Sequence, residues 1–102
     1  MVGKIKLVVK NFWKLNMNRN EEIMTILQEE CAEVIQAVSK VKRFGMSENH
    51  SSLVKELGDL QAMIEIMYEF QVVNCTVDQK FENIFQKRQK LKKFSHIFES
   101  NS

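Results

Sequence analysis

The chain has 102 residues, a formal net charge of +2 and 44% hydrophobic residues. These values are typical of one ordinary globular domain, and so small a net charge argues against a chain dominated by nucleic-acid binding. Three glycines and no proline leave few helix breakers, so long helices are expected.

Composition also limits the compartment and the kind of site. Cys31 and Cys75 lack CxxC spacing, so neither a zinc site nor a disulfide framework is indicated. His50 and His96 are isolated in the sequence and are expected at loops or helix ends rather than as ligands. We find no secretory signal and no apolar run long enough for a bilayer, so we expect the cytoplasm and no stable membrane association.

Residues 1–19 form a basic N-terminal segment without an acid; its charges are Lys4, Lys6, Lys10, Lys14 and Arg19. Apolar residues at helical spacing predict a short amphipathic helix here, from Ile5, Val8, Val9, Phe12 and Trp13. This helix is expected to pack on the rest of the chain; the alternative is a membrane surface. A further alternative is that Met17 is the natural start.

The first long helix is predicted over residues 20–43. Asn20 is its expected N-cap, acids follow in the first turn, and Phe44-Gly45 should end it. At about 100° per residue, one apolar stripe collects Ile23, Ile26, Leu27, Val34, Ala37, Val38 and Val41.

A polar turn over residues 46–50 precedes the second helix, which is predicted to run to about Val72. The candidate caps are Ser47, Ser51 and Ser52. Its apolar stripe collects Leu53, Leu57, Leu60, Met63, Ile64, Met67 and Phe70.

The third helix is predicted from a cap at Thr76 to about Phe94, and the tail over residues 95–102 is expected to fray. This helix is expected to bury Val77, Phe81, Ile84, Phe85 and Leu91.

Four carboxylates occupy unusual positions on the first two helices. Glu30 falls inside the first stripe and Glu33 at its edge, while Glu56 and Asp59 fall within the second stripe. Each pair is three residues apart and so shares a helical face. Ionised carboxylates are costly to bury without a compensating cation, and hard oxygen ligands suit Mg²⁺ or Mn²⁺. The alternative for either pair alone is an ordinary solvated face.

The spacing Glu29-Glu30-x-x-Glu33, 22 further residues, then Glu56-x-x-Asp59 resembles the EExxE…ExxD signature of the MazG-like all-α nucleoside triphosphate pyrophosphohydrolases. The similarity covers residues 20–94 and has the compact form of phage-encoded members, whose compartment would be the host cytoplasm. It implies hydrolysis of a nucleoside triphosphate, or a deoxynucleotide, to the monophosphate and pyrophosphate. It also implies that the metal ligands are Glu30, Glu33, Glu56 and Asp59. Glu29 would orient or deprotonate the attacking water; the alternative is that Glu29 is a surface acid.

The third helix carries a basic residue in its apolar stripe. Arg88, helped by Lys87, would grip a polyphosphate, because a guanidinium matches phosphate oxygens. The alternative is that Arg88 buries its stem and keeps its charge in water. MazG-like chains carry a KxxKN-like stretch here, and this chain departs from it with Leu91 in place of the asparagine.

Three helices with such wide stripes predict an antiparallel hairpin plus a third helix that assembles into a multi-helix bundle by oligomerisation. The resemblance also implies a homodimer or homotetramer. The rival function is a non-enzymatic nucleic-acid-binding module that uses the basic third helix. That reading leaves the carboxylates in the stripes unexplained.

Overall fold

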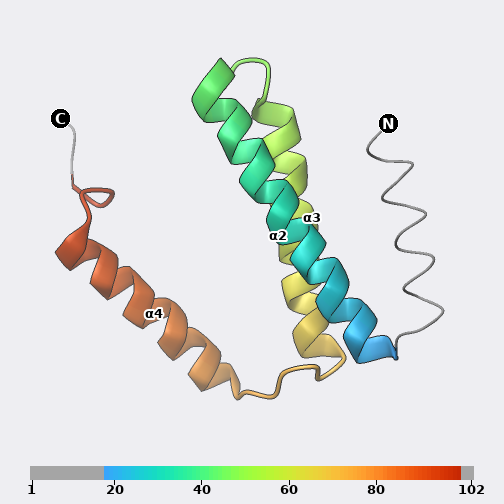
Figure 1. The fold of residues 1–102 in the computed structure, drawn as a ribbon. Coiled ribbons are helices and arrows are strands. Elements are labelled where there is room, and N and C mark those ends of the chain that lie inside the picture. Colours follow the sequence, from blue (N-terminus) through green and yellow to red (C-terminus); the bar gives the residue numbers. More distant parts are fainter. Residues whose placement is uncertain (1–17, 100–102) are drawn as a thin grey trace.

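A computed structural model describes residues 18–99 and places them in three α-helices, with no strand among them. The helices are α2 (Arg19–Phe44), α3 (His50–Glu69) and α4 (Val77–Phe94), as labelled in Figure 1. The predicted all-α class and the order of three helices are confirmed for this part of the chain. The predicted helix within residues 1–19 and the alternative start at Met17 lie outside the described residues.

Helix α2 begins one residue earlier than predicted, and its N-cap lies two residues before the predicted one. Asn18, not Asn20, is the N-cap: its Oδ1 accepts from the Glu21 backbone N–H at 2.8 Å, and its Nδ2 donates to Glu21 Oε1 at 2.8 Å. Glu21 and Glu22 lie in the first turn, where the helix dipole favours acids. Gly45 ends the helix as predicted, with φ at 98° and its N–H donating to Val41 O at 2.8 Å.

The turn into α3 uses a different cap from those predicted. Asn49 precedes the helix, and its side chain donates backward to Gly45 O at 2.9 Å instead of capping α3. Ser51 and Ser52 lie inside α3 and Ser47 lies in the turn, so the predicted serine cap is wrong. The Asn49 side chain thus forms its hydrogen bond within the turn, and the first backbone N–H groups of α3 have no side-chain cap.

Helix α3 ends at Glu69, three residues before the predicted Val72. Gln71 takes the left-handed conformation at φ 55°, its N–H donates to Tyr68 O at 3.1 Å, and the N–H of Val72 donates to Met67 O at 2.9 Å. This pair of reversed hydrogen bonds is the Schellman pattern, here with glutamine in the position that glycine usually holds. It turns the chain away from the helix axis.

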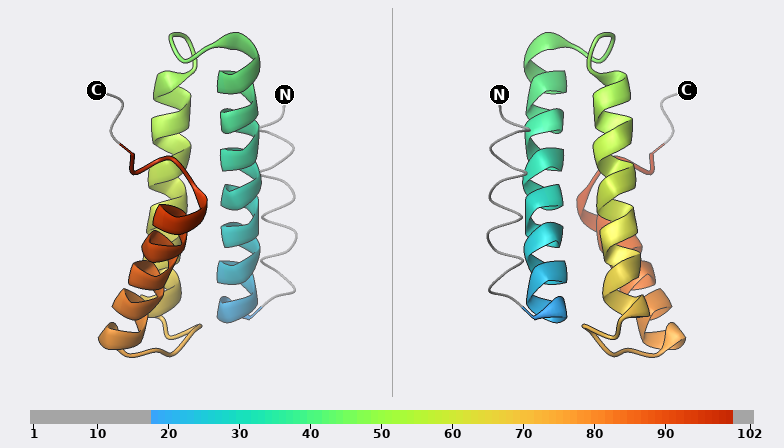
Figure 2. Two further views of the ribbon diagram at one scale, coloured as in Figure 1. Left: turned by 90° about the vertical axis from the view of Figure 1, so that its left-hand side faces the viewer. Right: turned by 90° about the vertical axis from the view of Figure 1, so that its right-hand side faces the viewer.

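Helices α2 and α3 lie antiparallel and side by side, as Figures 1 and 2 show. Helix α2 buries Ile23 and Ala37, together with the carboxylate residue Glu30, whereas α3 has no buried residue. Much of both stripes stays half-buried or exposed, with Val38, Leu57, Ile64 and Phe70 each more than a third exposed. The hairpin is therefore a thin two-helix layer, and one of its three buried residues is an acid.

Helix α4 stands apart from this hairpin (Figure 1), and among the described helices only α2 and α3 pack on each other. Thr76 begins it as predicted, with a complete capping box to Gln79, and it ends at Phe94 as predicted. Its stripe is not buried: Val77, Phe81, Ile84 and Phe85 are 50–67% exposed, and only Leu91 is half-buried. The prediction of burial is wrong for the single chain, because neither of the other two described helices packs on α4.

Two contacts at the ends of α4 hold aromatic rings against cations. Lys80 Nζ lies 4.6 Å from the centroid of Tyr68, which links the first turn of α4 to the end of α3. The Arg88 guanidinium lies 4.9 Å from the centroid of Phe98, within a turn formed by residues 95–99. Such contacts are worth about 0.5–1 kcal/mol at exposed sites, so the contact of Lys80 with Tyr68 favours one position of α4 but does not replace a core.

Candidate metal centre

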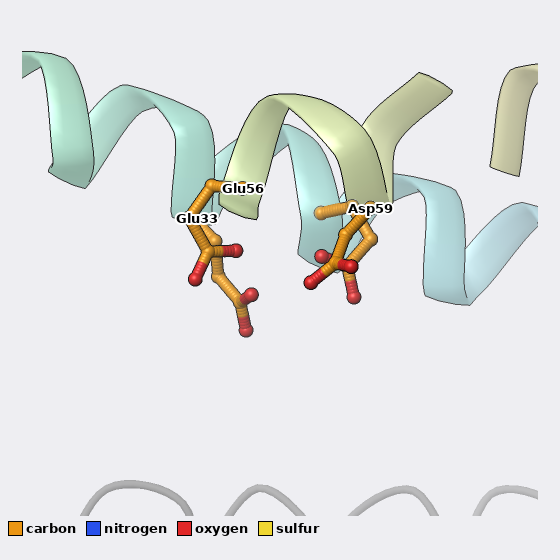
Figure 3. A group of neighbouring side chains, drawn as sticks. Glu33, Glu56 and Asp59 are labelled. Carbon is orange, nitrogen blue, oxygen red and sulfur yellow. The ribbon is translucent and has the colours of Figure 1, made fainter. Parts of the chain in front are cut away.

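Four carboxylates gather on one side of the α2–α3 hairpin. Glu30 and Glu33 come from α2, Glu56 and Asp59 from α3, and one oxygen from each lies within 4.8 Å of the others. Figure 3 shows Glu33, Glu56 and Asp59 pointing to the same side of the two helices. The i, i+3 spacing aligns each pair on its helix, and antiparallel packing brings the two pairs together. The structure thus joins the four residues that the sequence singles out.

The cluster is graded from buried to open. Glu30 is only 7% exposed, whereas the side chains of Glu56 and Asp59 are 18% and 42% exposed. Oε2 of Glu56 is buried and accepts no hydrogen bond from the described residues. Burying a carboxylate oxygen without a hydrogen-bond donor costs free energy. None of the described residues supplies that donor, so a bound cation is a suitable partner for this oxygen. Of the three side chains of Glu30, Glu56 and Asp59, that of Asp59 is the most open to solvent.

A lysine lies at this open side. Lys55 Nζ is 2.7 Å from Asp59 Oδ2 and 3.9 Å from Glu56 Oε1. The hydrogen bond to Asp59, then the charges of Asp59, Glu56 and Glu30, raise the pKa of Lys55 above its ordinary value. Sequence reasoning missed Lys55, although its i, i+4 spacing to Asp59 on one helix was a usable signal.

The donor set fits a hard divalent cation. Four carboxylates bring up to four negative charges within a few ångströms, and their mutual repulsion disfavours the cluster unless positive charge lies among them. Carboxylate oxygens are the ligands that Mg²⁺ and Mn²⁺ prefer. The geometry and the donor-free oxygen of Glu56 both agree with such an ion, so the residues present could hold a metal.

The remaining predicted site residues lie outside this group of four. Glu29 precedes Glu30 on α2, is half-buried, and has a buried Oε2. Lys87 and Arg88 are exposed on α4, and the single chain does not bring α4 against the hairpin. Arg88 instead stacks on Phe98. The roles assigned to these three residues stay predictions.

A family model described as the MazG nucleotide pyrophosphohydrolase domain matches residues 18–94, which include all three helices and both carboxylate pairs. The chain belongs to the MazG family. No match was found among curated proteins, and none among solved structures. At the level of the family, the MazG assignment makes this domain a nucleotide pyrophosphohydrolase, which is a hydrolase.

None of the helices within residues 18–99 combines the length and the apolar character that a membrane span needs. The four clustered carboxylates all lie inside the residues that the family model matches.

Proposed function

We propose that this MazG domain hydrolyses a nucleoside triphosphate, or a deoxynucleoside triphosphate, to the monophosphate and pyrophosphate. The observation that carries the proposal is the convergence of Glu30, Glu33, Glu56 and Asp59 within 4.8 Å, inside the family-matched region. In this reaction water attacks the α-phosphorus, the bond between that phosphorus and the bridging oxygen breaks, and pyrophosphate leaves with the electron pair.

The four carboxylates would hold Mg²⁺, for which Mn²⁺ is a substitute. Held there, such an ion would supply positive charge to offset the negative charge that develops at the attacked phosphorus. Antiparallel packing supports this role, because it fixes two donors on each of two helices before any ligand arrives.

Glu29 is the proposed base in this reaction. It lies on α2 beside the first pair of ligands, and its half-buried carboxylate would accept a proton from the attacking water. Glu29 lies next to Glu30 in the chain and one helical turn before Glu33. Its side chain could therefore reach a water molecule beside the metal without being a metal ligand itself. The proton then passes to solvent when the monophosphate leaves.

Substrate contacts from Lys87 and Arg88 would require self-association. The apolar face of α4 is exposed in the single chain, and so are parts of both hairpin stripes. Patches of this kind mark interfaces, and we propose that copies of the chain pack as a homodimer or homotetramer that covers them. Lys87 and Arg88 could then reach a triphosphate held at the cluster of a neighbouring copy.

One observation favours a second function. Helix α4 is exposed along nearly its whole length and carries Lys80, Lys87, Arg88, Lys90, Lys92 and Lys93. Such a helix could bind nucleic acid, in which case affinity for a duplex or a single strand would fall steeply with salt. Nucleic-acid binding gives no role to the carboxylate cluster, so we place it second.

The test is pyrophosphate release from a panel of canonical and modified NTPs and dNTPs, with and without Mg²⁺. Replacing Glu56 with glutamine should abolish metal-dependent release while the helices remain folded by circular dichroism. The matched control is Glu65→Gln, which makes the same change at an exposed position on α3 and should keep wild-type turnover. Full activity in the Glu56 variant would refute the metal role, and no release from any nucleotide would favour the nucleic-acid alternative.

A further inference from the structure

The feature behind this inference is the lysine at the open side of the carboxylate cluster. Lys55 lies on α3, next to Glu56 in the chain and one helical turn before Asp59. Its ammonium group is 2.7 Å from Asp59 Oδ2 and 3.9 Å from Glu56 Oε1. Two of the four proposed metal ligands therefore already share a cation that belongs to the protein.

The ammonium group of Lys55 is free to move away from the cluster. Its side chain is 69% exposed, and ion pairs between exposed groups are weak. The flexible stem of a lysine also lets the ammonium group move by several ångströms without a change in the backbone. Within the cluster Glu30 is only 7% exposed, whereas the side chain of Asp59, the partner of Lys55, is 42% exposed. A nucleotide that approaches the cluster on the side of Asp59 would meet Lys55.

Charge decides where the ammonium group lies in each state. Without a ligand, the carboxylates attract it. A divalent ion held by Asp59 and Glu56 would repel it, because the two positive charges would lie a few ångströms apart. A triphosphate at the same opening carries several negative charges and offers the ammonium group a new partner.

We propose that Lys55 neutralises part of the carboxylate cluster in the free protein and transfers its ammonium group from Asp59 to the triphosphate when the metal nucleotide binds. The inference rests on the proposed function, to which it adds a residue that positions the substrate. Lys55 thus opposes binding of the bare metal and favours binding of the metal together with its nucleotide.

The first measurement is the affinity for Mn²⁺ alone, by electron paramagnetic resonance or calorimetry, without nucleotide. Lys55→Gln should bind Mn²⁺ about threefold to tenfold more tightly than the wild type, because a screened like charge is removed from the neighbourhood of the ion. The matched control is Lys42→Gln, which makes the same charge change at an exposed position in the last turn of α2. It lies about 13 Å along the helix from Glu33 and should leave Mn²⁺ affinity unchanged.

The second measurement is steady-state pyrophosphate release. Lys55→Gln should raise the KM for the metal nucleotide by about tenfold with little change in kcat, since the lost contact is made to the bound substrate. Lys55→Arg keeps the charge and should restore both the Mn²⁺ affinity and the KM to near the wild-type values. A lysine with only a structural role would not produce this combination of tighter Mn²⁺ binding and a higher KM for the metal nucleotide.

The outcomes separate this inference from the function beneath it. Unchanged or weaker Mn²⁺ binding by Lys55→Gln, or an unchanged KM, would overturn the role of Lys55 while leaving the pyrophosphohydrolase in place. A wild-type protein that neither binds Mn²⁺ nor releases pyrophosphate would overturn both.

Discussion

The α2–α3 hairpin and helix α4 are built from similar local signals but reach different ends. α4 has the better-formed helix start, with a complete capping box at Thr76, whereas α3 has no side-chain cap at all. Yet α3 pairs with α2 and completes the carboxylate cluster, while the apolar face of α4 stays exposed. Caps and dipoles decide where a helix begins and ends; burial and the site require a second helix beside it.

The largest expected effect comes from making one substitution in both regions. Ile23→Ala, in the hairpin core, should lower the free energy of unfolding by about 2–3 kcal/mol at every protein concentration, because it leaves a cavity at a buried position. Ile84→Ala, on the exposed face of α4, should cost little in dilute protein and more as concentration rises, since only self-association would bury it. Urea unfolding over a hundredfold range of concentration measures both.

The result for Ile84 bears directly on the proposed assembly. A cost that does not depend on concentration would show that α4 packs within its own chain. Sedimentation of the wild type as a stable monomer at micromolar concentration would contradict the proposed dimer or tetramer.

The two glycines of the hairpin offer a sharper and smaller contrast. Gly45 ends α2 at φ 98°, which side chains rarely adopt, so Gly45→Ala should destabilise the protein by about 1–3 kcal/mol. Gly58 lies inside α3 and a Cβ there meets nothing within 4 Å, so Gly58→Ala should stabilise by about 0.5–1 kcal/mol. Thermal unfolding followed by circular dichroism should show shifts of opposite sign. A destabilised Gly58 variant would indicate that another chain packs closely against this turn of α3.

The smallest effect tests whether the cluster is kept for function at a cost in stability. In metal-free protein, Glu56→Gln should raise the free energy of unfolding by about 0.5–1 kcal/mol, because it removes a charge from a group of four carboxylates and gives the buried position a donor. Glu65→Gln, at an exposed position on the same helix, should change it by less than about 0.5 kcal/mol.

Added Mg²⁺ should reverse this order. The ion should stabilise the wild type and not the Glu56 variant, since binding to the folded state alone shifts the unfolding equilibrium. If Mg²⁺ stabilised both proteins equally, Glu56 would not be a ligand.

The sequence by itself determined the helices and the composition of the candidate site. The helical period, Gly45 and Thr76 located three helices with errors of at most three residues at their ends, and the positions of Glu30 and Glu56 in apolar stripes marked the acids that converge. These signals are local: they act within about one helical turn, so a chain read residue by residue contains them. The start of α3 after Asn49 was missed because the side chain of this residue donates to Gly45 O in the preceding turn and does not cap the helix.

Only the tertiary structure decided which residues meet. Antiparallel packing of α2 on α3 brings the two carboxylate pairs within 4.8 Å and places Lys55 at their open side. The left-handed backbone at Gln71 ends α3 earlier than predicted. Helix α4, which carries Lys87 and Arg88, then lies apart from the hairpin. Neither outcome follows from the helical period of the sequence. The angle between two helices depends on the backbone conformation of the turn that joins them and on which apolar faces pack together.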